Sequence, residues 1–169
     1  QLLAEAGYPN GFKTKLLTIF SIADTLTAAQ GYLKAVGIDA EIDLADSGRY
    51  YSETQQTGWK NKIVYRARRQ VPDWLSDINK EYSASSIELK SMTRPAGMQD
   101  ILDAALYATD DAAKIAKSQE FVKKLYDDST IIPLWGANYT IPRQKNVHNL
   151  EYYSPWGPNK LWGPAAVWL

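Results

Sequence analysis

A run of basic residues is the clearest sign of chemistry in the sequence. Between positions 60 and 69 the chain carries five cations and no acid: Lys60, Lys62, Arg66, Arg68 and Arg69. In a strand, Lys60, Lys62, Arg66 and Arg68 would share one face. Ligands of open α/β sheets bind at the carboxyl ends of parallel strands, and the planar guanidinium group matches carboxylates and phosphates. The run therefore predicts either an anion-receiving surface or a solvated strand face balanced by acids elsewhere.

Aromatic residues accompany this run. Tyr65 lies within it and Trp74 follows it, in a chain that holds 6 tryptophans and 11 tyrosines among 169 residues. Aromatic rings are common in ligand pockets and can stack on a flat ligand or a sugar. Most of these rings are nevertheless expected in the core or at interfaces.

Charges on two neighbouring strands predict ion pairs. Lys13 and Lys15 share one face of the first expected strand, and Asp39, Glu41 and Asp43 share one face of the second. If the two strands pair in parallel, the rows lie side by side. We interpret them as a salt-bridged surface, in which each exposed pair contributes less than about 1 kcal/mol.

The composition excludes several kinds of site. The chain has no cysteine and one histidine, which excludes disulfides, thiolate zinc sites, a cysteine nucleophile and any metal site that needs two imidazoles. His148 has no partner at the spacing of a catalytic triad and is interpreted as a surface residue. No glycine-rich phosphate loop is present. A balance of 19 basic and 19 acidic residues argues against a nucleic-acid partner.

The elements that position these residues alternate in type. Residue patterns predict strands over 12–19, 38–45 and 60–68, a short polar helix over 49–56, and a helix that begins near Ser21 or Asp24 and ends at Gly37. The apolar stripe of that helix is Ile22, Leu26, Ala29, Leu33 and Val36. On the second strand Ile38, Ala40, Ile42 and Leu44 share the buried face. This order predicts an α/β fold with a central, mostly parallel sheet, the first strand between the other two, and helices on both faces.

The second half is expected to be mainly helical. One helical turn over 73–79 and a loop over 80–95 precede helices over 98–106 and 111–127. The last helix should face inward with Ile115, Ala116, Val122 and Leu125. Short strands are expected over 131–135 and 139–141. At 169 residues the chain fits one domain, and we expect a single α/β lobe over 1–150 followed by an irregular, aromatic tail over 151–169.

Three stretches of the sequence resemble a known family. They are Leu2 to Phe12 (LLAEAGYPNGF) with the helix end at 33–38 (LKAVGI), then 112–135 with its last residues IIPLW, and 145–150 (KNVHNL). In this order and spacing they resemble the C-terminal lobe of family 5 extracytoplasmic solute-binding proteins, the peptide- and nickel-type receptors of bacterial ABC importers. The resemblance covers nearly the whole chain.

The resemblance implies a periplasmic-binding-protein-like lobe of a larger, two-lobed receptor. Such a receptor captures a solute outside the cytoplasmic membrane, in the periplasm or anchored to the membrane, and delivers it to an ABC permease without catalysis or a cofactor. The start at Gln1, within a helical pattern, agrees with an N-terminal lobe and signal sequence that precede it, and the tail over 151–169 is expected near the hinge or against that lobe. The alternative is a ligand-sensing lobe of a transcriptional regulator, because such lobes also occur behind DNA-binding domains.

One departure from the family pattern concerns the ligand. Peptide binders of this family often carry a tryptophan at the end of the third strand, an acid three residues later that receives the ligand's ammonium group, and then Asp-Pro. Here Tyr65 replaces the tryptophan, Arg68 stands where the acid would be, and Val71 precedes Pro72. A cation cannot hold an ammonium group, so we expect an anionic or strongly hydrogen-bonding ligand and doubt a peptide. The candidate ligand-binding residues are Tyr65, Arg66, Arg68, Arg69 and Trp74.

Overall fold

The computed structural model describes residues 1–19, 23–67, 74–136, 144–148 and 168. The chain forms two compact units, one of residues 1–67 and 84–93 and the other of residues 68–83 and 94–169. Each unit is described by itself. The division predicted at residue 150 stays a prediction, because the tail lies outside the described residues except for Trp168.

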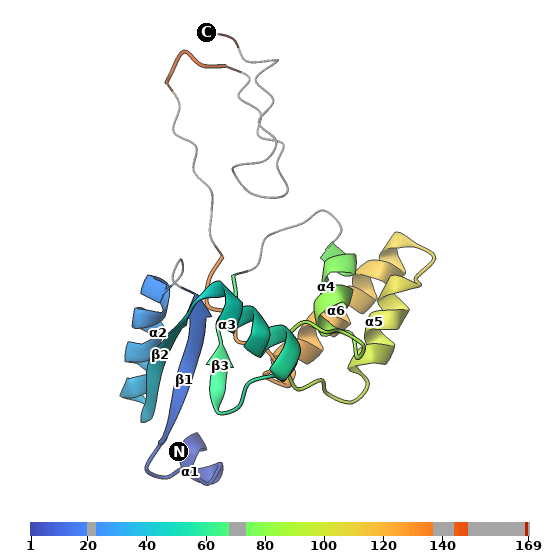
Figure 1. The fold of residues 1–169 in the computed structure, drawn as a ribbon. Coiled ribbons are helices and arrows are strands. Elements are labelled where there is room, and N and C mark those ends of the chain that lie inside the picture. The colour runs from blue at the N-terminus through green and yellow to red at the C-terminus, as the bar shows by residue number, and fades with distance from the viewer. Residues whose placement is uncertain (20–22, 68–73, 137–143, 149–167, 169) are drawn as a thin grey trace. The chain divides into compact units, whose positions relative to one another are not determined.

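The first unit is built on a three-stranded parallel sheet (Figure 1). It contains α1 (Leu2–Glu5), β1 (Phe12–Ile19), α2 (Ala23–Ala35), β2 (Ile38–Ala45), α3 (Ser47–Tyr51), the π-helical segment η2 (Ser52–Thr57) and β3 (Lys62–Val64). The strand order is β2-β1-β3, and Lys15 of β1 lies opposite Glu41 on one side and Lys62 on the other. The predicted α/β class and the central place of the first strand are confirmed.

Adjacent apolar residues of β1 supply a core on each face of the sheet. Leu16 packs with Leu26 of α2 and Ala40 of β2. Leu17 packs on the opposite face with Ala45 and with Tyr50 of α3. Successive residues of a strand point to opposite faces, so a sheet covered on both sides needs consecutive apolar residues. The predicted helices on both faces are confirmed, as the flanking positions of α2 and α3 show (Figure 1).

Two glycines allow a close backbone contact at the end of the sheet where β1 and β2 begin. Gly11 and Gly37 have φ angles of +73° and +93°, a region that favours glycine. A Cβ on Gly11 would lie 1.8 Å from the carbonyl oxygen of Gly37. The amide of Phe12 donates to that same oxygen at 3.3 Å. The turn after α2 is thereby held against the start of β1, where the register of the parallel pair begins.

The first unit corrects three details of the prediction. The third strand does not span 60–68 but begins at Lys62, because Asn61 has a φ of +54° and turns the chain. Val36 is exposed, since α2 ends one residue before it. Leu44 is exposed because the core under α2 extends along β2 only to Ile42. The short helix predicted over 49–56 is the succession of α3 and η2, and Ile22 lies outside the described residues.

The described part of the second unit is helical, with α4 (Trp74–Tyr82), α5 (Met98–Leu106) and α6 (Asp111–Asp127). The predicted bounds of α5 and α6 are confirmed. The carboxylate of Asp110 caps α6 by accepting from the amide of Ala113 at 2.8 Å. Leu102 and Phe121 are fully buried, and the ring of Phe121 meets that of Tyr82 edge-on, with 6.1 Å between centroids.

The length of α4 differs from the prediction. Instead of one turn over 73–79 it continues to Tyr82, into the predicted loop. Burial of Leu75 and Tyr82, seven residues apart on one helical face, favours this extension. The guanidinium group of Arg94 then donates to the carbonyl oxygens of Glu81, Tyr82 and Ser83 at 3.1, 3.3 and 2.9 Å. These bonds satisfy acceptors that a helix end leaves without partners of its own.

The orientation of α6 and the segment after it also differ. Ser118, Phe121 and Leu125 face inward, whereas Ile115, Ala116 and Val122 are exposed. Leu125 is therefore the one member of the predicted inward set that is buried. The predicted strand over 131–135 is absent, and Pro133 in its centre has no amide to donate to a ladder. The strand predicted over 139–141 lies outside the described residues. No helix in the described ranges is long and apolar enough to cross a membrane.

Candidate functional site

The candidate site of the first unit begins where β3 ends. The amide of Tyr65 donates to the carbonyl oxygen of Leu17 at 2.9 Å, which continues the β1–β3 ladder by one residue. The carbonyl oxygen of Tyr65 accepts from the hydroxyl of Tyr50 at 3.0 Å. The side chain of Tyr65 packs against the core of Leu16 and Leu26 and is partly buried. Tyr65 therefore fixes the end of the strand from which Arg66 extends.

Arg66 is held by a carboxylate that the sequence reasoning missed. Its Nη1 lies 2.8 Å from Oε2 of Glu88, and the same oxygen accepts from Nε2 of Gln55 at 3.1 Å. Only 10% of the Glu88 side chain and 29% of the Arg66 side chain are exposed. Hydrogen bonds between ionised groups at this separation are strong. Arg66 thus occupies a fixed position at the carboxyl end of β3, with its charge balanced.

The loop that supplies Glu88 is itself well anchored. The hydroxyl of Ser86 accepts from the amide of Glu88 at 3.0 Å. The amide of Lys90 donates to the carbonyl oxygen of Thr54 at 2.7 Å, and the amide of Trp59 donates to the hydroxyl of Ser91 at 2.7 Å. The only hint of this role in the sequence is a single acid between two apolar residues, Ile87 and Leu89, in a polar stretch.

Lys62 belongs to a cluster of four charges that joins four elements of the first unit. We call Asp43, Arg49, Glu53 and Lys62 the charge cluster. Nζ of Lys62 lies 2.8 Å from Asp43 and 2.6 Å from Glu53, and Arg49 reaches the same two acids at 2.6 and 3.0 Å. The hydrogen bonds from Arg49 and then from Lys62 hold the pKa of Asp43 far below its ordinary value. Bonds to Asp43 and then to Glu53 raise the pKa of Lys62.

These contacts separate the basic run into cations that pair with acids and cations whose contacts are not described. Lys62 and Arg66 are balanced by acids from other elements, as the alternative of a balanced strand face predicts for these two residues. Arg68 and Arg69 lie outside the described residues, so their role as ligand contacts stays a prediction. The predicted pairs between the first two strands are confirmed: Lys13 lies 3.9 Å from Asp39, and Lys15 lies 3.4 Å from Glu41, both on the solvated face.

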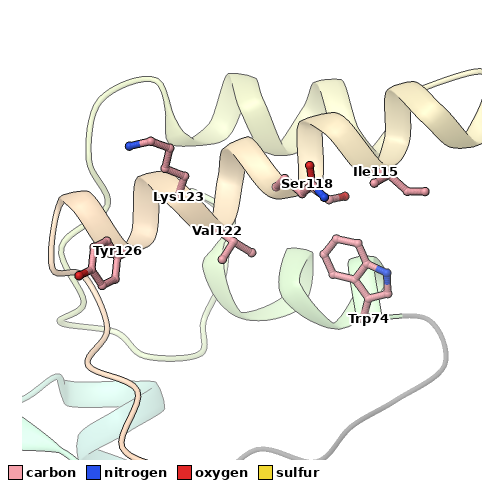
Figure 2. Close-up of a pocket in the computed structure, with 7 residues that line it drawn as sticks. Trp74, Ile115, Ser118, Val122, Lys123 and Tyr126 are labelled. Carbon is pink, nitrogen blue, oxygen red and sulfur yellow. The ribbon is translucent and has the colours of Figure 1, made fainter.

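Trp74, the remaining candidate, begins α4 in the second unit and lines an open groove with residues of α6 (Figure 2). The groove encloses about 510 Å³. Its other lining residues are Ile115, Ser118, Gln119, Val122, Lys123 and Tyr126. The indole ring faces α6 between Ile115 and Val122. Trp74 therefore contributes to an apolar surface of the second unit, which the sequence reasoning did not identify.

The described residues offer no group of histidine, cysteine, aspartate or glutamate side chains that could hold a metal ion. His148 is exposed, and its ring stacks on that of Trp168 with 4.0 Å between centroids. The backbone of the two residues forms an antiparallel bridge. The interpretation of His148 as a surface residue is confirmed.

Comparison with curated proteins identifies relatives that bind a solute. No family model matches the chain. The glutathione-binding protein GsiB of Escherichia coli (strain K12) and that of Shigella dysenteriae are each 27% identical to it over 161 residues, covering 87% of this chain and 31% of the relative. The chain therefore spans about a third of the length of the curated relatives it matches.

Solved structures share the fold. The periplasmic binding protein DppA of Helicobacter pylori, in complex with the peptide STSA, superposes with a TM-score of 0.65 and 21% identity, covering 76% of this chain and 26% of that one. The dipeptide-binding protein of Pseudoalteromonas sp. SM9913, in complex with Met-Leu, superposes with a TM-score of 0.62 and 16% identity, covering 76% of this chain and 27% of that one. NikA of Brucella suis, in complex with Fe(III)-EDTA, superposes with a TM-score of 0.62 and 18% identity, covering 76% of this chain and 29% of that one. The shared fold and the sequence relation confirm the resemblance: the chain is related to the family 5 extracytoplasmic solute-binding proteins.

Proposed function

We propose that the protein containing this chain captures a solute outside the cytoplasmic membrane and delivers it to an ABC permease. The chain would supply part of the ligand cleft, and a lobe outside residues 1–169 would supply the rest. The observation that carries the proposal is a relation to glutathione-binding proteins over 87% of the chain. The fold of the solved binding proteins agrees with it. A periplasmic or membrane-anchored location follows from the same role.

The chemistry of the relatives' ligands supports an anionic solute. Glutathione, the two bound peptides and EDTA all carry carboxylate groups. Arginine is the side chain best suited to receive a carboxylate, because its fork donates two parallel hydrogen bonds. We therefore retain Arg68 and Arg69 as proposed anion contacts, together with Arg66. Because Arg68 stands where a peptide binder would hold the ligand's ammonium group, we expect the solute to be recognised by its carboxylate groups and not by an ammonium group.

The contacts of Arg66 decide which arginine gives the cleaner test. Replacing Arg66 would also remove the cation that lies 2.8 Å from the largely buried carboxylate of Glu88. A buried charge that loses its partner destabilises the fold, so a loss of binding in that variant would be ambiguous. Arg68→Ala is the better probe. Lys60→Ala is the matched control, because Lys60 is an exposed cation of the same run.

The experiment uses the full-length receptor and isothermal titration calorimetry. Glutathione, a dipeptide and other carboxylate solutes are first screened by thermal shift, and the best of them is titrated. Arg68→Ala should weaken binding about tenfold or more, the effect of losing a charge-assisted hydrogen bond, and Lys60→Ala should leave the affinity unchanged. Unchanged affinity in Arg68→Ala would remove Arg68 from the site. If none of these solutes raises the melting temperature of the receptor, the expectation of a carboxylate ligand is contradicted.

The proposal includes neither catalysis nor a cofactor, and the relatives named above are binding proteins. None of them is a transcriptional regulator, so the alternative of a sensing lobe gains no support from them. The gene segment upstream of the Gln1 codon separates the two roles. A signal peptide and a further lobe are expected there, whereas a DNA-binding domain would make the protein a regulator.

A further inference from the structure

The groove between α4 and α6 has the character of an interface. The large apolar side chains that line it are exposed to solvent: Ile115 is 56% exposed, Val122 is 54% exposed and Tyr126 is 73% exposed. They recur at helical spacing along α6, where Ile115 and Val122 lie on either side of Trp74 and Tyr126 lies farther along the helix (Figure 2). Isolated exposed apolar residues are ordinary on a protein surface, but a continuous patch of them marks a contact with another surface.

The pattern of α6 shows that this face is additional to the one already buried. Ser118, Phe121 and Leu125 form the buried stripe of the helix. At 3.6 residues per turn, Ile115, Val122 and Tyr126 form a second stripe directly beside it. The apolar arc of α6 is therefore wider than the arc that the described residues cover. A helix with so wide an apolar arc is typical of a position between two layers.

Two polar side chains of the groove, those of Ser118 and Lys123, are already committed to neighbours on α6. The hydroxyl of Ser118 donates to the carbonyl oxygen of Lys114 at 2.6 Å. The ammonium group of Lys123, on the rim, pairs with the carboxylate of Asp127 at 2.5 Å. Sites for small polar solutes need a few well-placed polar groups that orient the ligand. These two side chains do not supply such groups, and the rings and aliphatic side chains of Trp74, Ile115 and Val122 suit the groove to apolar side chains of a protein segment.

We infer that the groove is covered by a segment of the same receptor that lies outside residues 1–169 and inserts apolar side chains against Trp74, Ile115 and Val122. This inference rests on the proposed function. The chain matches 31% of the length of its curated relatives, so more than two thirds of such a receptor remains to pack against it. The groove is thus a contact within the receptor.

Cysteine labelling of the full-length receptor tests the inference, on a background without other cysteines. Val122→Cys places a thiol in the groove, and Glu120→Cys, on another face of the same helix, is the matched control. Glu120 is 49% exposed and pairs only with the exposed Lys117 among the described residues. If the segment covers the groove, Val122→Cys should react with a maleimide about tenfold or more slowly than Glu120→Cys, because local opening must precede reaction.

Each other outcome overturns the inference. Equal labelling rates would show an open groove. Protection that arises only when a solute is added would assign the groove to the ligand, and protection lost on dilution would assign it to a second copy of the protein. A gene that encodes no further segment would leave the groove without its occupant. The labelling needs no ligand, so the inference can fail while the transport role stands, and calorimetry on Arg68→Ala can fail while the groove is protected.

Discussion

The charge cluster offers the sharpest test of what stabilises the first unit. Asp43 accepts from Arg49 at 2.6 and 3.2 Å, and its oxygen lies 2.8 Å from Nζ of Lys62. Its side chain is 14% exposed. Asp43→Asn removes the negative charge with almost no change in volume. The cluster then carries one acid and two cations in place of two and two.

The expected cost follows from what each cation retains. Breaking a buried ion pair costs about 3 to 5 kcal/mol when a charge is left without a partner. Here Arg49 and Lys62 both keep Glu53, at 3.0 and 2.6 Å. Arg49 is also partly solvated, which screens its charge. We therefore expect Asp43→Asn to lower the free energy of unfolding by about 2 kcal/mol, less than a full buried pair.

Asp39→Asn is the matched control. Asp39 lies on the same strand, and the substitution removes the same charge. Its partner Lys13 is 3.9 Å away, and the two side chains are 67% and 89% exposed. An exposed pair of this kind contributes about 0.5 kcal/mol or less. Urea denaturation, followed by circular dichroism, measures both variants against the parent chain. Equal shifts in the two variants would refute the reasoning, because they would show that burial and multiple bonds add nothing.

The pH dependence of the same variant has a defined sign. Bonds from Arg49 and Lys62 lower the pKa of Asp43 in the folded state below its ordinary value of 3.8. A group whose pKa falls on folding stabilises the protein fully above its unfolded pKa and progressively less as the pH falls below it. The difference between the parent chain and Asp43→Asn should therefore be constant between pH 6 and 8, values well above 3.8, and decrease below pH 4. A difference that grows on acidification would contradict the pairing.

Two further predictions concern the backbone and a helix end. Gly11→Ala should destabilise the chain by about 3 kcal/mol or more, because its Cβ would lie 1.8 Å from a carbonyl oxygen. Gly31→Ala, inside α2 with no atom within 4 Å of the new Cβ, should instead stabilise it by about 0.5 to 1 kcal/mol; urea midpoints that shift in the same direction for both would contradict this. Arg94→Ala should cost about 2 kcal/mol, since three carbonyl oxygens at the end of α4 lose their donor. Faster amide exchange at the end of α4 would accompany this loss, and an unchanged exchange rate and urea midpoint would contradict it.

Regular patterns in the sequence were sufficient for the parallel sheet and two of the helices. Alternation over 38–45 and helical spacing over 111–127 are local properties, and the structure reproduces both ranges. Pairing of Lys13 with Asp39 also followed, because neighbouring parallel strands bring regular rows into register. The length of α4 could not be predicted from local patterns, since its last turn depends on Arg94, which lies twelve residues beyond Tyr82 in the sequence. Contacts of that kind join segments whose approach no local pattern encodes.

The same limit explains why the sequence pattern did not reveal which acids pair with the cations of the basic run. Five cations without an acid between 60 and 69 predict a positive surface, but Glu88 and Asp43 reach Arg66 and Lys62 from 22 and 19 residues away in the sequence. Opposite charges within 3 Å cancel most of each other's field at the distance of an approaching solute. We therefore expect the run's attraction for an anion to rest mainly on Arg68 and Arg69. If so, a receptor carrying both Arg68→Ala and Arg69→Ala should lose the salt dependence of solute binding, whereas Lys62→Ala should affect stability and leave that dependence intact.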